Sequence, residues 1–197
     1  DSNGDFSGSD YSYIGHDTSG QLLIHQDSPS GSDNMIFRTN ATEAMRIDGS
    51  GHITKPLQPA FFARIQSGSA QEDVAVNSSI TVQFNEEIFD NNADYNNSNY
   101  TFTAPVTGRY HFDCRLYLLN VPSNATYIYF QLETSNKTIL MQINDVDSDQ
   151  AYDFLQGSVL VDMDASDTAK VLFYQAAGSQ TTHIHHVSTV FSGHLVA

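Results

Sequence analysis

The sequence predicts an all-β protein, and three observations lead to this prediction. The chain contains 12 Phe and 10 Tyr but no Trp, together with many Val, Ile and Thr, a composition typical of strands. Residues 109–119 alternate between apolar and polar side chains, as a strand with one buried face requires. No segment shows a sustained helical period, and the nearest one, residues 41–47, is too short to form a helix alone.

Strand-like segments separated by turn residues continue from Pro59 to the end, at the spacing of a β-sandwich. Between residues 109 and 119, Tyr110, Phe112 and Cys114 begin the apolar face, and His111 and Asp113 begin the polar one. About ten strands are expected, at residues 61–66, 79–84, 87–89, 100–103, 109–119, 127–133, 138–143, 157–163, 169–175 and 185–196.

The chain is predicted to divide near residues 55–59 into a segment of short hairpins, residues 1–57, and a head domain, residues 58–197. The hairpin segment contains a weak repeat in which the turns fall at residues 17–20 and 48–51. Asp and Gly at these turns tolerate the positive φ angles of tight hairpins. Each hairpin is too short and polar to bury a face alone, so we expect trimerisation to order them.

Two sequence patterns resemble known families. The stretch YTFTAPVTGRYHFDCRLYLL at residues 100–119 and the ending FSGHLVA resemble the globular heads of complement-Q and tumour-necrosis-factor-like proteins. This resemblance implies a trimeric jelly-roll head that binds partners and performs no chemistry. The stretch FRTNATEAMRIDGSGHI resembles the segment preceding the C-terminal domain of bacteriophage tail fibres, which implies that the hairpins belong to a fibre shaft.

Charge and missing motifs exclude several functions. A formal net charge of −15 argues against nucleic acid, whose binding needs basic surfaces that neutralise phosphates. No run of about 18 apolar residues is present, so no membrane insertion is expected. The sequence contains no nucleophile elbow, phosphate-binding Gly loop, paired-Cys zinc spacing or His-Glu-x-x-His motif. We therefore expect no enzymatic activity.

The jelly-roll resemblance places the connections at residues 120–126, 144–153 and 176–182 at the end of the head opposite the shaft. Such exposed loops are where binding residues concentrate. The expected receptor contacts are Asn124, Tyr127, Asp149, Tyr152 and Gln180, the two tyrosines because an aromatic ring with a polar tip is favoured at interfaces. The same polar composition is also that of an ordinary solvated loop.

Asp145, Asp147 and Asp149 place hard oxygen ligands close together, as a calcium ion prefers. The complement-type resemblance implies calcium held near the threefold axis by this loop, ahead of an Asp-Gln-Ala stretch. Asp149, Gln150 and Ala151 supply that stretch, although Tyr152 stands where a small Ser is expected. The alternative is an acidic loop that is merely solvated.

His183 and His185 would share one face of a strand. Around a threefold axis, six such imidazoles would surround a transition-metal ion octahedrally, and bacteriophage tail fibres as a class carry His-x-His motifs of this kind. The alternative is that these histidines are polar residues of a loop or strand edge.

Two functions remain open at this point. The first is the receptor-binding tip of a homotrimeric bacteriophage tail fibre, located on the virion and attaching it to a glycan or protein of the host cell surface. The second is a secreted complement-type lectin or structural adhesion protein of a cell. The hairpin repeat and the turn at residues 46–51 favour the first.

Overall fold

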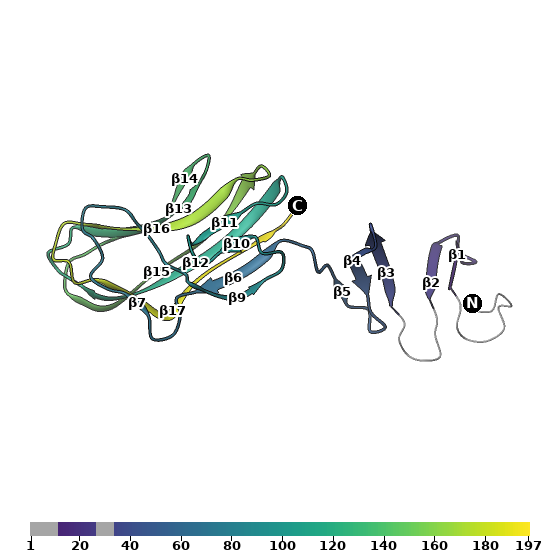
Figure 1. The fold of residues 1–197 in the computed structure, drawn as a ribbon, viewed down its shortest axis with the longest axis horizontal. Helices are drawn as coiled ribbons and strands as arrows, with labels where there is room; N and C mark the ends of the chain where they lie inside the picture. Colours follow the sequence, from purple (N-terminus) through teal and green to yellow (C-terminus); the bar gives the residue numbers. More distant parts are fainter. Residues whose placement is uncertain (1–11, 27–33) are drawn as a thin grey trace. The chain divides into compact units, whose positions relative to one another are not determined.

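The computed structural model describes residues 12–26 and 34–197, and every regular element among them is a β-strand. The described residues contain no helix long and apolar enough to cross a membrane. The chain divides into two compact units, Asp1–Leu57 and Gln58–Ala197 (Figure 1). An all-β sandwich was predicted, and the fold confirms that prediction.

The N-terminal unit contains only short strands, and none of its described residues is buried. One hairpin and one three-stranded sheet form it. Its strands are β1 (Ser12–His16), β2 (Leu22–Gln26), β3 (Met35–Thr39), β4 (Thr42–Ile47) and β5 (Ile53–Thr54). Large apolar side chains remain in solvent, with Ile14 76% and Leu22 71% exposed. This unit has no core of its own among the described residues.

The β1–β2 and β4–β5 turns repeat the same hydrogen bonds. Asp17 Oδ1 accepts the backbone N–H groups of Ser19 and Gln21, both at 2.8 Å. Asp48 Oδ1 accepts those of Ser50 and His52, both at 2.9 Å. Gly20 and Gly51 adopt φ angles of 77° and 84°, values that Gly reaches without steric cost. The weak sequence repeat is therefore a repeat of turn structure.

The head is a sandwich of two six-stranded sheets, and all ladder pairs within them are antiparallel. In the first sheet the order is β15-β12-β17-β6-β9, with β7 beside β17; in the second it is β10-β11-β16-β13-β14, with β8 beside β16 (Figure 1). The strands are β6 (Ala60–Arg64), β7 (Ala70–Gln71), β8 (Ile80–Thr81), β9 (Glu86–Asp90), β10 (Tyr95–Asn96), β11 (Thr101–Thr103), β12 (Gly108–Val121), β13 (Tyr127–Thr134), β14 (Thr138–Asp145), β15 (Gln150–Met163), β16 (Thr168–Ala176) and β17 (His183–Leu195).

Aromatic side chains fill the space between the two sheets. Seven phenylalanines are fully buried, and alternation along β12 and β13 points every second residue inward. The ring of Phe61 lies 4.9 to 5.0 Å from those of Tyr95, Phe102 and Phe191. Aromatic pairs at such separations add to the free energy of burial. Cys114 also faces inward, and burial raises the pKa of its thiol.

Two strand predictions differ from the structure, and two short strands were missed. The segment expected at residues 157–163 is the second half of a 14-residue strand that begins at Gln150. Pairing with β12 over this whole length explains the extension. The segment expected at residues 79–84 reduces to the two residues of β8, and the short strands β7 and β10 were not predicted. Two-residue strands carry too little periodicity to be recognised.

The chain enters and leaves the head at the same end. The backbone N–H of Leu195 donates to Pro59 O at 3.0 Å, and that of Arg109 donates to Ala197 O at 2.7 Å. Strand β12 runs from this end to Val121, where it pairs with Gln150. The connections after β12, β14 and β16 therefore lie together at the opposite end of the head.

Candidate functional site

Three loops meet at the end of the head remote from Pro59, and we call them the end loops. They are residues 122–126, 146–149 and 177–182. Asp149 Oδ1 accepts the backbone N–H of Ser123 at 2.7 Å, which joins the first loop to the second. The first and third are joined by Asn124, whose Oδ1 accepts the N–H of Ser179 at 2.9 Å and whose Nδ2 donates to Ser179 Oγ at 3.1 Å. The end loops form one connected surface.

A glycine allows two of these loops to approach closely. Gly178 has a φ of 84°, and a Cβ there would lie 2.7 Å from Ala125 N and 2.8 Å from Asn124 Oδ1. Any other residue at this position would push the first and third loops apart and strain the backbone. The spacing between these loops therefore depends on Gly178.

An open pocket of about 540 Å³ lies beside the end loops. Val121, Pro122 and Ala151 are its apolar lining residues, and Asp73 and Asp149 are its acidic ones. Asn120, Gln150, Thr181 and His183 complete the lining. A pocket with apolar walls and a few polar groups is the usual form of a binding site for a small chemical group. Its carboxylates favour a ligand group that donates hydrogen bonds.

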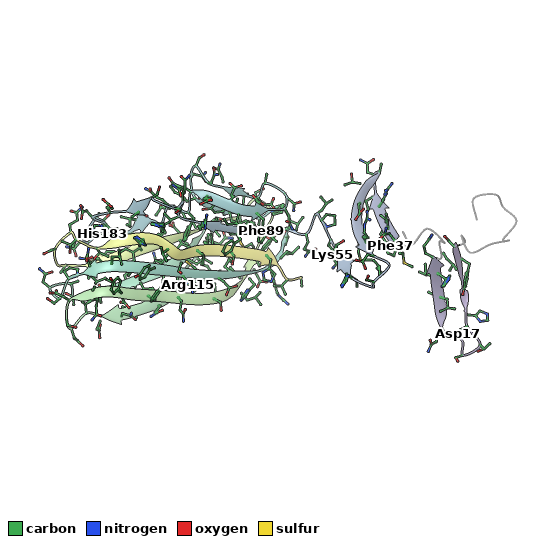
Figure 2. The ribbon with its side chains drawn as sticks, turned by 90° about the horizontal axis from the view of Figure 1, so that it is seen from below. Asp17, Phe37, Lys55, Phe89, Arg115 and His183 are labelled. Carbon is green, nitrogen blue, oxygen red and sulfur yellow. The ribbon has the colours of Figure 1, made fainter. Side chains whose placement is uncertain are left out.

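The outward side of the first sheet carries a second feature, an aromatic face made of Tyr117, Tyr152 and Phe154. Leu160 lies farther along β15 on the same side of the sheet. The ring of Tyr117 is nearly parallel to those of Phe154 and Tyr152, with centroids 4.6 and 6.1 Å away. Tyr152 is 67% and Phe154 46% exposed. Figure 2 looks onto this side of the head, where Phe89, Arg115 and His183 are labelled. Exposed apolar surface of this kind makes the aromatic face a candidate interaction site.

Comparison with known proteins identifies the head. Residues 60–196, more than half of the chain, match the C1q domain. This chain is a member of the C1q domain family. No curated protein sequence matches the chain.

Solved structures show the same fold at low sequence identity. The globular domain of zebrafish complement 1qA is 16% identical with a TM-score of 0.50, and 71% of this chain aligns with 98% of that one. Eiger TNF from S. frugiperda is 9% identical with a TM-score of 0.51, with coverage of 71% and 94%. Murine APRIL at pH 8.5 is 9% identical with a TM-score of 0.51, with coverage of 71% and 99%. These likenesses confirm a jelly roll of the C1q and TNF type.

The five expected contact residues do not gather at one place on the C1q head. Asn124, Asp149 and Gln180 lie in the end loops, and Gln180 Nε2 donates to Asp73 O at 2.6 Å. Tyr152 belongs to β15 and lies on the aromatic face, because the expected loop 144–153 is only four residues long. Tyr127 opens β13 and lies on the outward side of the other sheet.

The side chains of these loop residues hold the end loops in place. Asn124, Asp149 and Gln180 each bond to a group of another segment. The pKa of the Asp149 carboxyl is lowered because the backbone and side chain of Ser123 donate hydrogen bonds to it. These contacts position the loops, and Asp149 also lines the neighbouring pocket, which is the better candidate for direct contact with a ligand.

No single copy of the described chain assembles a metal site. Among residues 12–26 and 34–197, no group of three or more His, Cys, Asp and Glu side chains is placed to hold an ion. Asp145, Asp147 and Asp149 are exposed on or beside the second end loop. A calcium site would therefore combine carboxylates from several copies around an axis, and it stays a prediction.

The two histidines proposed as metal ligands do share one face of β17, as residues on either side of buried Ile184. His183 Nδ1 accepts the N–H of Asp73 at 3.2 Å, and His185 Nδ1 accepts that of Val187 at 3.2 Å. Burial, followed by the nearby His186 and His183, lowers the pKa of His185. Accepting at Nδ1 keeps the proton on Nε2 in the neutral ring. A transition-metal site needs Nε2 without that proton, so it remains a prediction that requires these contacts to change.

Sequence reasoning missed the aromatic face and most of the pocket. Tyr152 and Phe154 lie two residues apart on β15, and this spacing was the available signal. Residues 144–153 were instead expected to form a loop, and the next strand was expected to begin at residue 157. The pocket has no local signal, because Asp73, Pro122 and Ala151 come from parts of the chain far apart in sequence.

Proposed function

We propose that this chain is the receptor-binding head of a homotrimeric bacteriophage tail fibre, which attaches a virion to a glycan or protein on the host cell surface. It is a binding module and not an enzyme. The observation that carries the proposal is the aromatic face on one sheet of a C1q-type head, lying next to an end surface that contains a pocket.

The aromatic face supports the homotrimer. A solvated sheet face ordinarily carries polar residues, whereas here Tyr152, Phe154 and Leu160 stand in solvent. Around a threefold axis, each subunit would cover the exposed face of its neighbour. The ring of His185 stands edge-on to Tyr117 at 5.7 Å, so the imidazoles would lie within the same interface.

A trimer would present three copies of the end loops and the pocket side by side. Once one copy engages a cell surface, the other two bind at high effective concentration. Weak contacts at each pocket would then add to firm attachment. This arrangement suits a virion, because the host cell surface carries many copies of the same receptor.

The N-terminal unit supports the fibre part of the proposal. Its two Asp-Gly turns share one hydrogen-bond pattern, and the apolar side chains of residues 12–26 and 34–57 have no covering core. Hairpins without a core are stable only when other strands cover them. Repeated hairpins covered by neighbouring chains would make the shaft that carries the head.

A matched pair of substitutions tests the trimer. Leu160, on the same side of the first sheet as the aromatic face, and Leu140, on the second sheet, are both 54% exposed. Leu160→Asp should turn the trimer into monomers by placing three charges in the interface, whereas Leu140→Asp should leave the trimer mass unchanged. Multi-angle light scattering measures both. A wild-type chain that is monomeric at micromolar concentration would defeat the proposal.

A second matched pair tests the pocket. Ala151→Phe would fill the pocket without removing any hydrogen bond of the end loops, and Ala165→Phe makes the same change at an exposed site near Thr107. Binding of the labelled trimer to susceptible cells should fall at least tenfold for Ala151→Phe only. Equal binding by both variants would remove the pocket from recognition.

A further inference from the structure

The outward side of the second sheet carries an unusual set of residues, which we call the tyrosine face. Directly paired residues on adjacent strands share a face, so the registers of β16, β13 and β14 define rows across it. Tyr174, Tyr129 and Ile143 form one row; Leu172, Gln131 and Leu140 form the next; and Tyr127 precedes both along β13. Where a solvated sheet would be polar, this face is aromatic and aliphatic.

The three tyrosine rings form one cluster with nearly parallel planes. Tyr129 and Tyr174 have centroids 4.9 Å apart at an angle of 14°, and Tyr127 lies 6.2 Å from each. All three are partly exposed. Their cross-strand packing holds the rings in place, so a ligand meets a surface that is already ordered, which lowers the entropic cost of binding.

The hydroxyl groups of these tyrosines are free. Within the described part of the chain, none of the three is hydrogen-bonded to another protein group. The core tyrosines differ, because Tyr95 donates to Phe84 O at 3.0 Å and Tyr110 donates to Val106 O at 2.7 Å. The cluster therefore offers three phenol groups, each of which can donate and accept a hydrogen bond.

The tyrosine face is nearly neutral in a strongly acidic chain. Its charges in the rows beyond Leu172 are Lys170 and Glu133, which pair at 3.5 Å, and Asp145 lies at the other end, opposite Tyr127. The chain as a whole carries a net charge of −15. A polyanion would be repelled by the molecule, and the lysine within these rows, Lys170, is already paired with Glu133.

We propose that the tyrosine face is a second binding site and that its ligand is an uncharged glycan. A pyranose ring has a face of C–H bonds, which packs against aromatic and aliphatic side chains, and a rim of hydroxyl groups. Free phenol groups and the Gln131 amide match that rim, and the low charge of the face matches a neutral sugar. The inference rests on the proposed function in one respect: a trimer built on the aromatic face leaves the tyrosine face of every subunit open.

Affinity electrophoresis of the full chain tests this proposal. Native gels would contain dextran, mannan or galactan as uncharged probes, and heparin or alginate as acidic ones. At least one uncharged polysaccharide should retard the wild-type chain, and neither acidic one should. The double substitution Tyr129→Ala with Tyr174→Ala should weaken the interaction at least tenfold. The double substitution Tyr129→Phe with Tyr174→Phe, which keeps the rings but loses two hydroxyls, should weaken it less.

Controls separate this inference from the proposed function. Tyr13→Ala removes an exposed tyrosine of the N-terminal unit and should leave retardation unchanged. Light scattering should give a trimer for every variant. A trimer that no uncharged polysaccharide retards, or one whose retardation survives the double alanine substitution, overturns the glycan site and leaves the trimeric head standing. A monomer that is still retarded would support the glycan site and defeat the trimer.

Discussion

The two units of this chain differ in how much apolar surface they bury. The head encloses seven phenylalanines between two sheets, whereas no described residue of the N-terminal unit is buried. Both units use antiparallel strands and tight turns, so local structure does not separate them. The head is therefore stabilised by its own hydrophobic core, whereas the hairpins depend on other strands that cover their apolar side chains.

The largest expected effect compares one phenylalanine from each unit. Phe61→Ala should lower the free energy of unfolding of the head by about 3–5 kcal/mol, because it leaves a cavity between several rings. Phe37→Ala removes the same atoms from a side chain that is 41% exposed and should change that free energy by less than about 0.5 kcal/mol. Urea denaturation at fixed protein concentration measures both. Similar losses would show that the two units share a core.

The next effect compares two glycines. A Cβ at Gly193 would lie 2.6 Å from Phe112 Cδ1 and 2.8 Å from Phe61 Cε1, so Gly193→Ala should destabilise the head by about 1–3 kcal/mol. At Gly51 nothing lies within 4 Å, but its φ is 84°. Gly51→Ala should therefore strain the β4–β5 turn alone. Thermal unfolding of the head should respond to the first change and ignore the second.

The features that could be predicted from the sequence are those set by residues close together in the chain. The alternation of residues 109–119 predicted most of β12, because a strand with one buried face requires alternating apolar and polar residues. The Asp-Gly turns were predicted for a similar reason, since the carboxylate and the glycine act within five residues. Both are local effects, and local effects can be read from a sequence.

Long-range pairing escaped prediction. Residues 150–153 were expected in a loop, yet they pair with β12 from Val121 to Leu118 and belong to a strand. That change moved Tyr152 from an expected loop to the aromatic face. The sequence showed that polar residues would lie in the end loops, but it did not show their hydrogen-bond partners. In the structure Asn124 bonds to Ser179 and Asp149 bonds to Ser123. Partners of this kind depend on the fold.

A smaller effect tests the turn repeat of the N-terminal unit. Asp48→Ala removes the acceptor of the Ser50 and His52 amides, so these two amides should exchange hydrogen faster while the core amides of the head keep their protection. Asp48→Asn retains an acceptor oxygen and should preserve most of the protection. Hydrogen exchange followed by NMR measures both variants. Loss of protection throughout the head would mean that the units unfold together.

The smallest effect compares two capping carboxylates on lowering the pH. Hydrogen bonding to His52 lowers the pKa of Asp48, and hydrogen bonding to Ser123 lowers that of Asp149. Because the pKa is lowered in the folded state, each of these hydrogen bonds stabilises its loop fully at pH values above the ordinary Asp pKa of about 3.9. This stabilisation is lost as the pH falls through the lower pKa of the folded state. The Ser123 amide signal should shift in that acidic range, and Asp149→Asn should abolish the shift. If the pH-dependent shift of the Ser123 amide signal is unchanged in this variant, the shift reports the titration of another group.

The boundary between the two units has an evolutionary consequence. Because the described strands of the head pair only with one another and the boundary falls at Leu57 and Gln58, an exchange of the whole head would transfer all three end loops, the pocket and both outward faces together. No strand would be cut, and no ladder would need a new partner. Under the proposed function, such an exchange would change the host range of a virion in one step while its shaft stayed the same.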